Sequence, residues 1–268
     1  MKKLFETAAV LSLLLTTGSA LAADIATRPQ ARASVSEAVY SWTGLYVGAN
    51  AGYTTPRRNH LDVSGTDTGG DGLGTLLDLG LLPSRIASKP SGFVGGAQAG
   101  YNLQSGLLVY GIEADIQGVS ARDNFSIVSI PPSTPRTLTG SNSLNWLATA
   151  RARVGVTVAP MALIYVTGGL AAGEHELTLS TACPACAPPT PSSSTSRRTS
   201  TGWTAGAGLE WALARNWSIK GEYLYYDLGK TGATVTYDYV MWTSSLTTHV
   251  DNSGHIVRLG INYKMAGD

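Results

Sequence analysis

Hydrophobic and polar positions alternate with a period of two along several stretches of the chain, most clearly over 202–229. In 202–212 the aromatic and aliphatic side chains fall on one face, whereas Glu210 falls on the other. In 217–229 the aromatic residues oppose Lys220 in the same way. A period of two is the signature of a β-strand, because successive side chains leave opposite faces of the pleat. The short interval between the two stretches predicts a hairpin.

Other stretches of the chain show the same alternation, although 162–174 does so too weakly for its faces to be assigned. The predicted strands, in chain order, are 42–53, 92–102, 107–119, 145–158, 162–174, 202–212, 217–229 and 255–264. They are about ten residues long with aromatic residues towards their ends, as expected of tilted strands that cross a bilayer. No second long apolar run follows the N-terminal one, so any membrane crossing is expected to use strands.

The links between the predicted strands alternate strictly between long and short. The first, third, fifth and seventh links are long, and the second, fourth and sixth are short. In an antiparallel meander all the long links then fall at one end, as in outer-membrane barrels. The pattern predicts an all-β fold: an eight-stranded antiparallel up-and-down transmembrane β-barrel with long extracellular loops and short periplasmic turns. We expect 122–143 and 176–201 to be loops, and 230–253 to be a loop or a strand extension.

The N-terminus has the features of a secretory signal peptide. Lys2 and Lys3 provide a positive region, 10–15 is apolar, and the small residues around Ala22 form a cleavage site. We expect cleavage after Ala22, with Ala23 as the alternative. The predicted organisation is therefore a signal peptide over 1–22, a periplasmic N-terminal leader over 23–41, and an outer-membrane barrel over 42–268.

Composition narrows the classes of function. The net charge is +1 and 14% of residues are charged, which gives no indication of nucleic-acid binding. Cys183 and Cys186 lie in a Pro/Ser/Thr-rich stretch that lacks the strand-to-helix context of a redox motif. His175 alone does not complete a metal site with them. A loop disulfide between the two cysteines remains open, and no cofactor or metal is expected.

Charged residues of the predicted strands all fall on the face opposite the aliphatic and aromatic residues. They are Glu113, Asp115, Arg151, Arg153, Glu210, Lys220, Glu222 and Arg258. Several glycines share this face, and a solvated face gains nothing from glycine, which weakens a strand. An eight-stranded lumen is only just wide enough for side chains, so long charged groups there need small neighbours. We therefore expect the charged face to point inward, with Glu210 and Lys220 roughly opposite each other.

This inward face has two interpretations. The charges form a selective pore or proton path, or they form a structural network that replaces a hydrophobic core; we favour the structural network. The opposite face is expected to contact lipid, with aromatic girdles at the two interfaces. The residues assigned to this face are Tyr53, Tyr101, Tyr110, Trp146, Trp203, Trp211, Trp217, Tyr223, Tyr225 and Tyr263.

Four segments carry a resemblance to a known family: 42–53, 202–210, 217–229 and 257–263. They resemble the small outer membrane immunogenic proteins, or porin-family β-barrels, of alphaproteobacteria, which share the architecture of the OmpA transmembrane barrel. The resemblance implies a monomeric barrel with exposed loops and a role in envelope integrity or host contact rather than catalysis. It implies outer-membrane lipid and lipopolysaccharide, the barrel-insertion machinery and host or surface ligands as partners, and no nucleic acid.

The favoured function is thus an integral outer-membrane barrel with a structural and surface-display role, its lumen plugged by paired charges. A narrow porin-like channel for small solutes is the first alternative, and a soluble periplasmic ligand-binding barrel is the second. An enzyme is not expected, because the four histidines are scattered without a matching Ser/Asp spacing, and no catalytic residue is assigned.

Overall fold

The computed structural model describes residues 40–58, 60–69, 72–129, 136–182, 192–238 and 243–265. The predicted signal peptide, almost all of the leader, and Cys183 and Cys186 lie outside these residues. The elements are β1 (Gly44–Pro56), β2 (His60–Asp67), α1 (Leu73–Asp78), β3 (Arg85–Ala87), β4 (Gly92–Ser105), β5 (Leu108–Ser129), β6 (Arg136–Ala159), β7 (Ala162–Ala182), β8 (Ser192–Ala212), β9 (Trp217–Asp238) and β10 (Thr243–Lys264). No helix among the described residues is long and apolar enough to cross a membrane.

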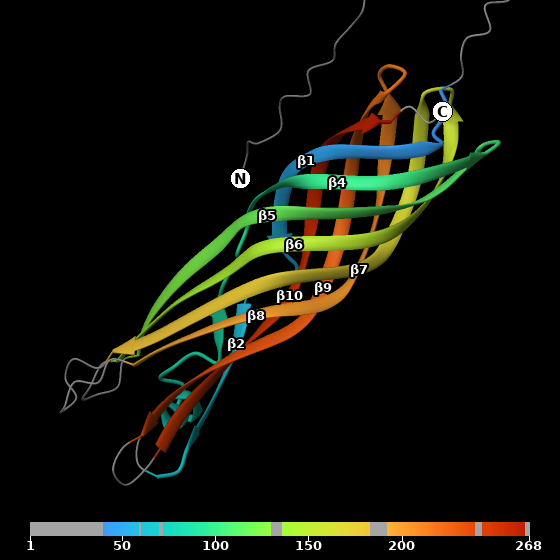
Figure 1. Ribbon diagram of the computed structural model, residues 1–268. Coiled ribbons are helices and arrows are strands. Elements are labelled where there is room, and N and C mark those ends of the chain that lie inside the picture. The colour runs from blue at the N-terminus through green and yellow to red at the C-terminus, as the bar shows by residue number, and fades with distance from the viewer. Residues whose placement is uncertain are drawn as a thin grey trace, which may run out of the picture. The chain divides into compact units, whose positions relative to one another are not determined.

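Eight antiparallel strands close into a ring (Figure 1). Sequential pairing runs from β1 to β4 and on to β10, and β10 pairs back with β1, for example Ala49 with Ile261. This closure confirms the predicted fold class. The short turns lie at one end of the ring, and Gly106, with φ +62°, supplies the left-handed residue in the β4–β5 turn. We call this the short-turn end and the opposite one the long-link end.

Burial alternates along the strands near the short-turn end. The inward residues of β4 are buried and the outward ones are exposed, as expected for strands with two unlike surroundings. β7, whose faces the sequence did not assign, follows the same pattern: Leu163 and Tyr165 are buried, whereas Ile164 and Val166 are exposed. The alternation was hidden because both faces are apolar over this stretch.

The predicted long loops are mostly strands, which corrects their assignment. β5 continues to Ser129 and β6 begins at Arg136, so most of 122–143 is paired. Likewise β7 runs to Ala182 and β8 begins at Ser192 within the predicted loop 176–201. β9 and β10 extend through most of 230–253, which agrees with the expectation of a strand extension and not with that of a loop. Threonine favours strands, and Leu177 and Leu179 alternate with polar residues, so these segments can pair and bury one face.

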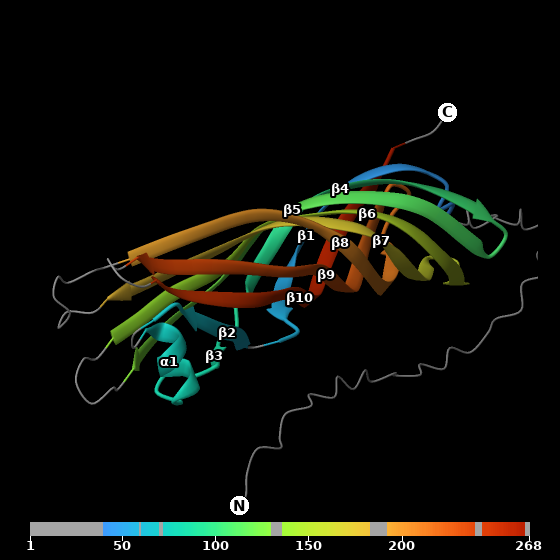
Figure 2. The same ribbon diagram turned by 90° about the horizontal axis from the view of Figure 1, so that it is seen from below.

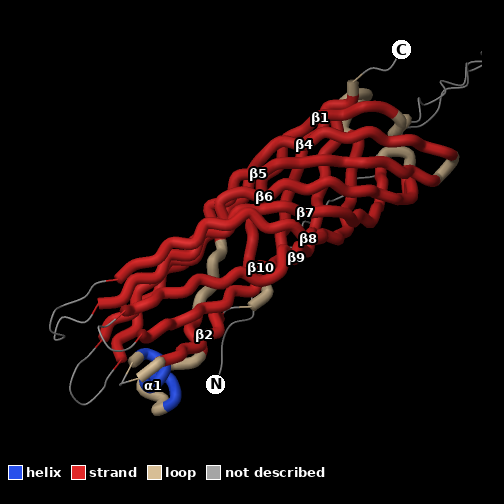
Figure 3. Tube along the Cα trace, turned by 60° about the horizontal axis from the view of Figure 1, so that its bottom comes forward, coloured by secondary structure: helices blue, strands red, loops and turns tan. Residues whose placement is uncertain are grey.

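Towards the long-link end, the ring opens between β8 and β9. Pairing between β8 and β9 ends at Trp203 and Asp227, and the two strands then diverge (Figure 1). Beyond it, β5 to β8 form one four-stranded sheet, while β9, β10, β2 and β3 form another. β2, β3 and α1 lie at the long-link end beside β10 (Figure 2), and strands dominate both parts (Figure 3). We call the two sheets with α1 the distal sandwich.

Irregularities in strand pairing mark the start of the distal sandwich. The register shifts between Gly118 and Ala121 in β5, between Leu144 and Trp146 in β6, and between Asp227 and Lys230 in β9, opposite Asp251 and Ser253 of β10. A β-bulge bends a strand and increases its twist. The bulges therefore redirect the strands where the ring gives way to two sheets.

The distal sandwich has its own hydrophobic core. Its buried members are Leu61, Val63, Leu73, Leu76, Leu82, Ile86, Leu138, Leu177, Leu179, Ala233, Val235, Leu246 and Val250. α1 is fixed at its start by Asp67, whose carboxylate accepts hydrogen bonds from the backbone N–H groups of Gly74 (3.2 Å) and Thr75 (2.7 Å). These bonds satisfy N–H groups that the first turn of a helix leaves free. The long-link end, which the sequence predicted to consist of loops, is thus folded around its own core.

We predict that Leu246→Ala loosens the distal sandwich. Leu246 is fully buried in its core, and such a truncation costs about 2–5 kcal/mol because it removes apolar contacts and leaves a cavity. Hydrogen exchange of the amides in the distal half of β10 should accelerate, whereas exchange near Ile261 should not change. Thr236→Ala, on the exposed face of β9, is the control. Unchanged exchange in Leu246→Ala would contradict a packed core.

Candidate functional site

The eight charged residues predicted to share a face are gathered inside the ring. They come from β5, β6, β8, β9 and β10, and each is at most 6% exposed. Strand register sets Glu113 opposite Arg151, and Glu222 opposite Arg258. The four acidic and four basic groups balance in formal charge, so they need no counter-ion from outside. We call them the interior ion cluster.

Arg151 is the centre of the interior ion cluster. Its Nη2 donates to Glu113 Oε1 (2.5 Å) and Asp115 Oδ2 (2.7 Å), and its Nη1 donates to Glu222 Oε1 (3.1 Å). Its Nε donates to the Thr149 hydroxyl at 2.9 Å. One guanidinium thus joins carboxylates from two strands that are not neighbours, β5 and β9, by charge-assisted hydrogen bonds.

Two further cations bind the same carboxylates. Arg258 donates from Nε to Glu222 Oε2 (2.7 Å) and from Nη2 to Asp115 Oδ2 (3.0 Å). Lys220 Nζ lies 2.7 Å from both carboxylate oxygens of Glu113. Glu113, Asp115 and Glu222 are therefore each shared between two cations from different strands. The cluster is a continuous network rather than a set of separate pairs.

Glu210 and Lys220 are register partners, as the sequence predicted, but their charged groups bind elsewhere. Glu210 accepts from Arg153 Nη2 (2.7 Å), the Ser218 hydroxyl (2.6 Å) and Asn262 Nδ2 (2.8 Å). Inside a narrow ring, groups on distant strands are as close as those on adjacent strands. Strand neighbourhood alone therefore does not decide which charges meet.

Two buried tyrosines belong to the cluster and were not assigned to it from the sequence. The Tyr46 hydroxyl donates to Glu113 Oε2 (2.7 Å) and accepts from Arg153 Nη1 (3.1 Å). The Tyr165 hydroxyl donates to Glu222 Oε1 (2.9 Å), and its ring lies 3.9 Å below the Arg153 guanidinium. The alternation places Tyr46 on the charged face, which is the signal that would have identified it.

Glycine makes room for these tyrosines. A β-carbon at Gly100 would collide with the Tyr46 ring and hydroxyl, and one at Gly208 would collide with Tyr165. Both glycines lie on the inward face of their strands. The close approach explains why glycine accompanies the charges on that face.

Hydrophobic layers lie on both sides of the interior ion cluster. On the short-turn side, Trp42 packs among inward-facing residues of the ring and is 2% exposed. The members of this layer are Trp42, Val109, Leu163, Tyr165 and Ala212. On the long-link side, the members are Val94, Ala121, Leu144, Leu147, Ala171, Leu224, Tyr226, Leu228 and Ile256. The interior is thus filled by apolar, ionic and again apolar layers.

The aromatic residues assigned to the lipid face lie on the outside of the ring. Trp146 and Tyr225 are half-buried, and the other eight are exposed. Trp203 contacts Tyr225 at 5.2 Å between ring centroids near the long-link side, and Trp217 contacts Tyr263 at 5.0 Å near the short turns. The aromatic pairs therefore stand at two separate heights on the wall.

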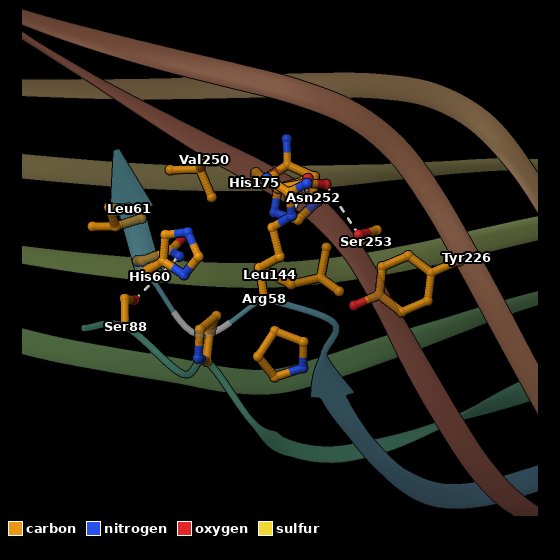
Figure 4. Close-up of a pocket in the computed structure, with 14 residues that line it drawn as sticks. Arg58, His60, Leu61, Ser88, Leu144, His175, Tyr226, Val250, Asn252 and Ser253 are labelled. Carbon is orange, nitrogen blue, oxygen red and sulfur yellow. Dashed lines mark hydrogen bonds and ion pairs between the residues drawn. The ribbon is translucent and has the colours of Figure 1, made fainter. Parts of the chain in front are cut away.

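A small cavity of about 20 Å³ lies where the ring meets the distal sandwich (Figure 4). His175 and Asn252 line it, and both His175 Nε2 and Asn252 Oδ1 lack a hydrogen-bond partner among the described residues. Leu144 and Tyr226, from the apolar layer of the ring, form part of its wall. The volume is enough for about one water molecule. Burial lowers the pKa of His175 to about 4, so the imidazole is neutral at pH 7.

No group of three or more His, Cys, Asp or Glu side chains within the described ranges is arranged to hold a metal ion. Cys183 and Cys186 lie outside those ranges, so a disulfide between them stays an open expectation of the sequence.

Comparison with known proteins identifies similar chains. A family model described as an outer membrane protein β-barrel domain matches residues 8–264. The chain is 36% identical over 250 residues to the 31 kDa outer-membrane immunogenic protein of Brucella melitensis, covering 92% of this chain and 93% of that one. It is 31% identical to the 22 kDa outer membrane protein of Rhizobium leguminosarum, covering 65% and 66%. Among solved structures, the outer membrane protein OprG of Pseudomonas aeruginosa matches with a TM-score of 0.44 and 12% identity, covering 84% and 99%.

We predict that Arg151→Met strongly destabilises the ring. Removing one partner of a buried ionic network costs about 3–5 kcal/mol, because the remaining carboxylates are left without a counter-charge. The free energy of unfolding, measured in urea on refolded protein, should fall by this amount, and Glu113→Gln in the same chain should restore part of it. Arg197→Met is the matched control: Arg197 pairs with Glu176 at 2.7 Å but is exposed to solvent, which screens the pair, so a much smaller loss than in Arg151→Met is expected. Equal losses in the two variants would contradict a stabilising interior cluster.

We predict that acid weakens the distal sandwich through His175. The unfolded chain takes up a proton below the ordinary pKa of about 6.5, whereas the buried imidazole does so only near 4. Stability is thus unaffected above pH 6.5 and declines as the pH falls towards 4, by about 3 kcal/mol at most. The protection factors of the distal amides, which compare the measured exchange rate with the intrinsic rate at each pH, should fall between pH 6.5 and 4.5. His175→Gln should remove most of this dependence, and an identical pH profile in that variant would refute the assignment.

Proposed function

The chain belongs to the outer membrane protein β-barrel family, and we propose that it is a structural and surface-display protein of the outer membrane whose barrel is closed to solutes. The filled interior carries this proposal. Arg151, Arg258 and Lys220 are held by carboxylates on several strands, and an apolar layer lies on each side of them. An ion that crossed would have to displace all three layers.

Closure distinguishes the proposal from its alternatives. A narrow channel needs mobile water beside its charges, whereas Arg151 at the centre here donates to three carboxylates and Arg258 to two. A soluble periplasmic barrel does not fit an outer-membrane protein. We also infer that the protein has no catalytic role, in keeping with relatives that are named as outer-membrane immunogenic proteins.

Display is the second half of the proposal. The short turns face the periplasm, so the distal sandwich projects from the cell and offers folded sheets to antibodies or surface ligands. Its outer faces are rich in exposed Ser and Thr, for example Thr195 and Thr236. We expect lipid to cover the aromatic wall and lipopolysaccharide to surround the base of the sandwich, after insertion by the barrel-assembly machinery.

Conductance and labelling test the two halves of the proposal. Refolded protein in a planar bilayer should give no stable channel steps. Arg151→Ala is measured beside it, so that any steps that do occur can be assigned to the lumen or to another source. In a chain with Cys183→Ser and Cys186→Ser, a membrane-impermeant maleimide should label Thr195→Cys on intact cells. Ala214→Cys, in the exposed β8–β9 turn, should be labelled only after permeabilisation. Reproducible steps that Arg151→Ala alters would establish the channel instead, and labelling of Ala214→Cys alone would reverse the orientation.

A further inference from the structure

Two long strand edges in the distal sandwich have no neighbouring strand among the described residues. They are 192–202 of β8, which pairs only with β7, and 228–238 of β9, which pairs only with β10. The two edges diverge from the last pair, Trp203 and Asp227 (Figures 1 and 3). An unpaired edge presents a row of free backbone N–H and C=O groups, which is a template for another strand.

The two edges are complementary to each other. They are equal in length, run antiparallel, and continue from strands that already pair from Ala212–Ser218 to Trp203–Asp227. Gly229, with φ +76°, adds one residue to β9, after which Ala233 and Val235 are buried and Thr236 is exposed. With this extra residue, Thr195 of β8 lies opposite Thr236, and both point outward.

We propose that a second copy of this chain occupies the edges, so that β8 of each copy pairs with β9 of the other. Two copies in one membrane have the same end facing outward, so the twofold axis that relates them must lie between the two barrels and be perpendicular to the membrane. A rotation of 180° about that axis places each β8 edge beside the partner's β9 edge. The two four-stranded sheets of each copy then continue into those of the other copy. Such an isologous contact closes on itself and stops at a dimer.

Charge is compatible with this pairing. In the extended register, Arg198 lies opposite Ala233 and Lys230 lies opposite Thr201, so no like charges face each other directly. Arg197 is already paired with Glu176 on β7 at 2.7 Å. Like charges directly opposite would disfavour a strand pair, and none is present.

The other side of the sandwich is protected from the same contact. There the edge strand β3 has only three residues. The chain before β4 runs along β5, where Ser91 forms a bridge with Arg122 and the Lys89 backbone N–H donates to Asp123 at 2.7 Å. Short and covered edges are the usual protection against unwanted pairing. Only the seam between β8 and β9 presents two long, regular edges within the described residues.

Crosslinking between differently tagged copies tests the proposal. Both copies carry Cys183→Ser and Cys186→Ser; one also carries Thr195→Cys and the other Thr236→Cys, so no copy can crosslink within itself. In intact outer membranes a short bismaleimide should give a product that contains both tags. Val128→Cys, on the exposed face of β5, replaces Thr195→Cys in the control and should give far less product. Equal yields in the two experiments would overturn the proposal.

Charge substitution supplies a second measurement that does not depend on crosslinking. Thr195→Lys with Thr236→Lys sets two lysines opposite each other at both seams and should reduce the dimer about tenfold in light scattering of detergent-purified protein. Thr195→Glu with Thr236→Lys should restore it. Heat-modifiable migration on gels verifies that each barrel is folded. A monomeric mass for the unmodified protein at all concentrations, as the family resemblance implies, or no effect of the paired lysines, would refute the seam dimer.

Discussion

The narrow interior of an eight-stranded ring is the constraint from which the rest of this structure follows. Its width is just sufficient for side chains, so charges placed inside must be neutralised by one another. Arg151 meets this condition by joining three carboxylates at 2.5–3.1 Å. The fixed width also requires glycine where a tyrosine crosses the lumen, as at Gly100 beside Tyr46. The positions of the charged residues, the glycines and the tyrosines therefore all follow from the limited width of the lumen.

The inward and outward faces could be predicted from the sequence, but the partners inside could not. Outside 162–174, a period of two separates the two faces of each predicted strand, and the glycines that share a face with Glu113 and Arg258 indicated that this face points inward. Their contacts depend on ring closure, which brings β10 near β5 and lets Arg258 reach Asp115 at 3.0 Å. Glu210 illustrates the limit, since its register partner is Lys220 but its bound cation is Arg153. Contacts across a lumen have no local pattern in the sequence.

The distal sandwich was hidden for a different reason. Its strands are rich in Ser and Thr, which suggests loops, although Leu177 and Leu179 already alternate with polar residues. The second sheet depends on β2, whose partner β10 lies far away in the chain, as in the pair Leu246 and Gly65. The Ser and Thr content of these strands reflects their exposed faces. Their buried faces pack against strands that are far away in the sequence, so a short stretch of sequence does not reveal them. The interior cluster was thus partly predictable, and the sandwich was not.

The open seam follows from the same packing physics. Inside the membrane the ring is held apart by long charged side chains, and Arg151 alone spans from β6 to β5 and β9. Beyond the bulges the distal sandwich has an apolar core, mainly of Leu, Val and Ala, which is buried only where two sheets approach to about 10 Å. A closed ring of eight strands that flattens to this spacing must bend sharply at two sides. β2 and β3 extend the sheet at one side, whereas pairing ends at Trp203 and Asp227 on the other. The flattening of the ring into two sheets around the core of the distal sandwich therefore leaves the edges of β8 and β9 exposed.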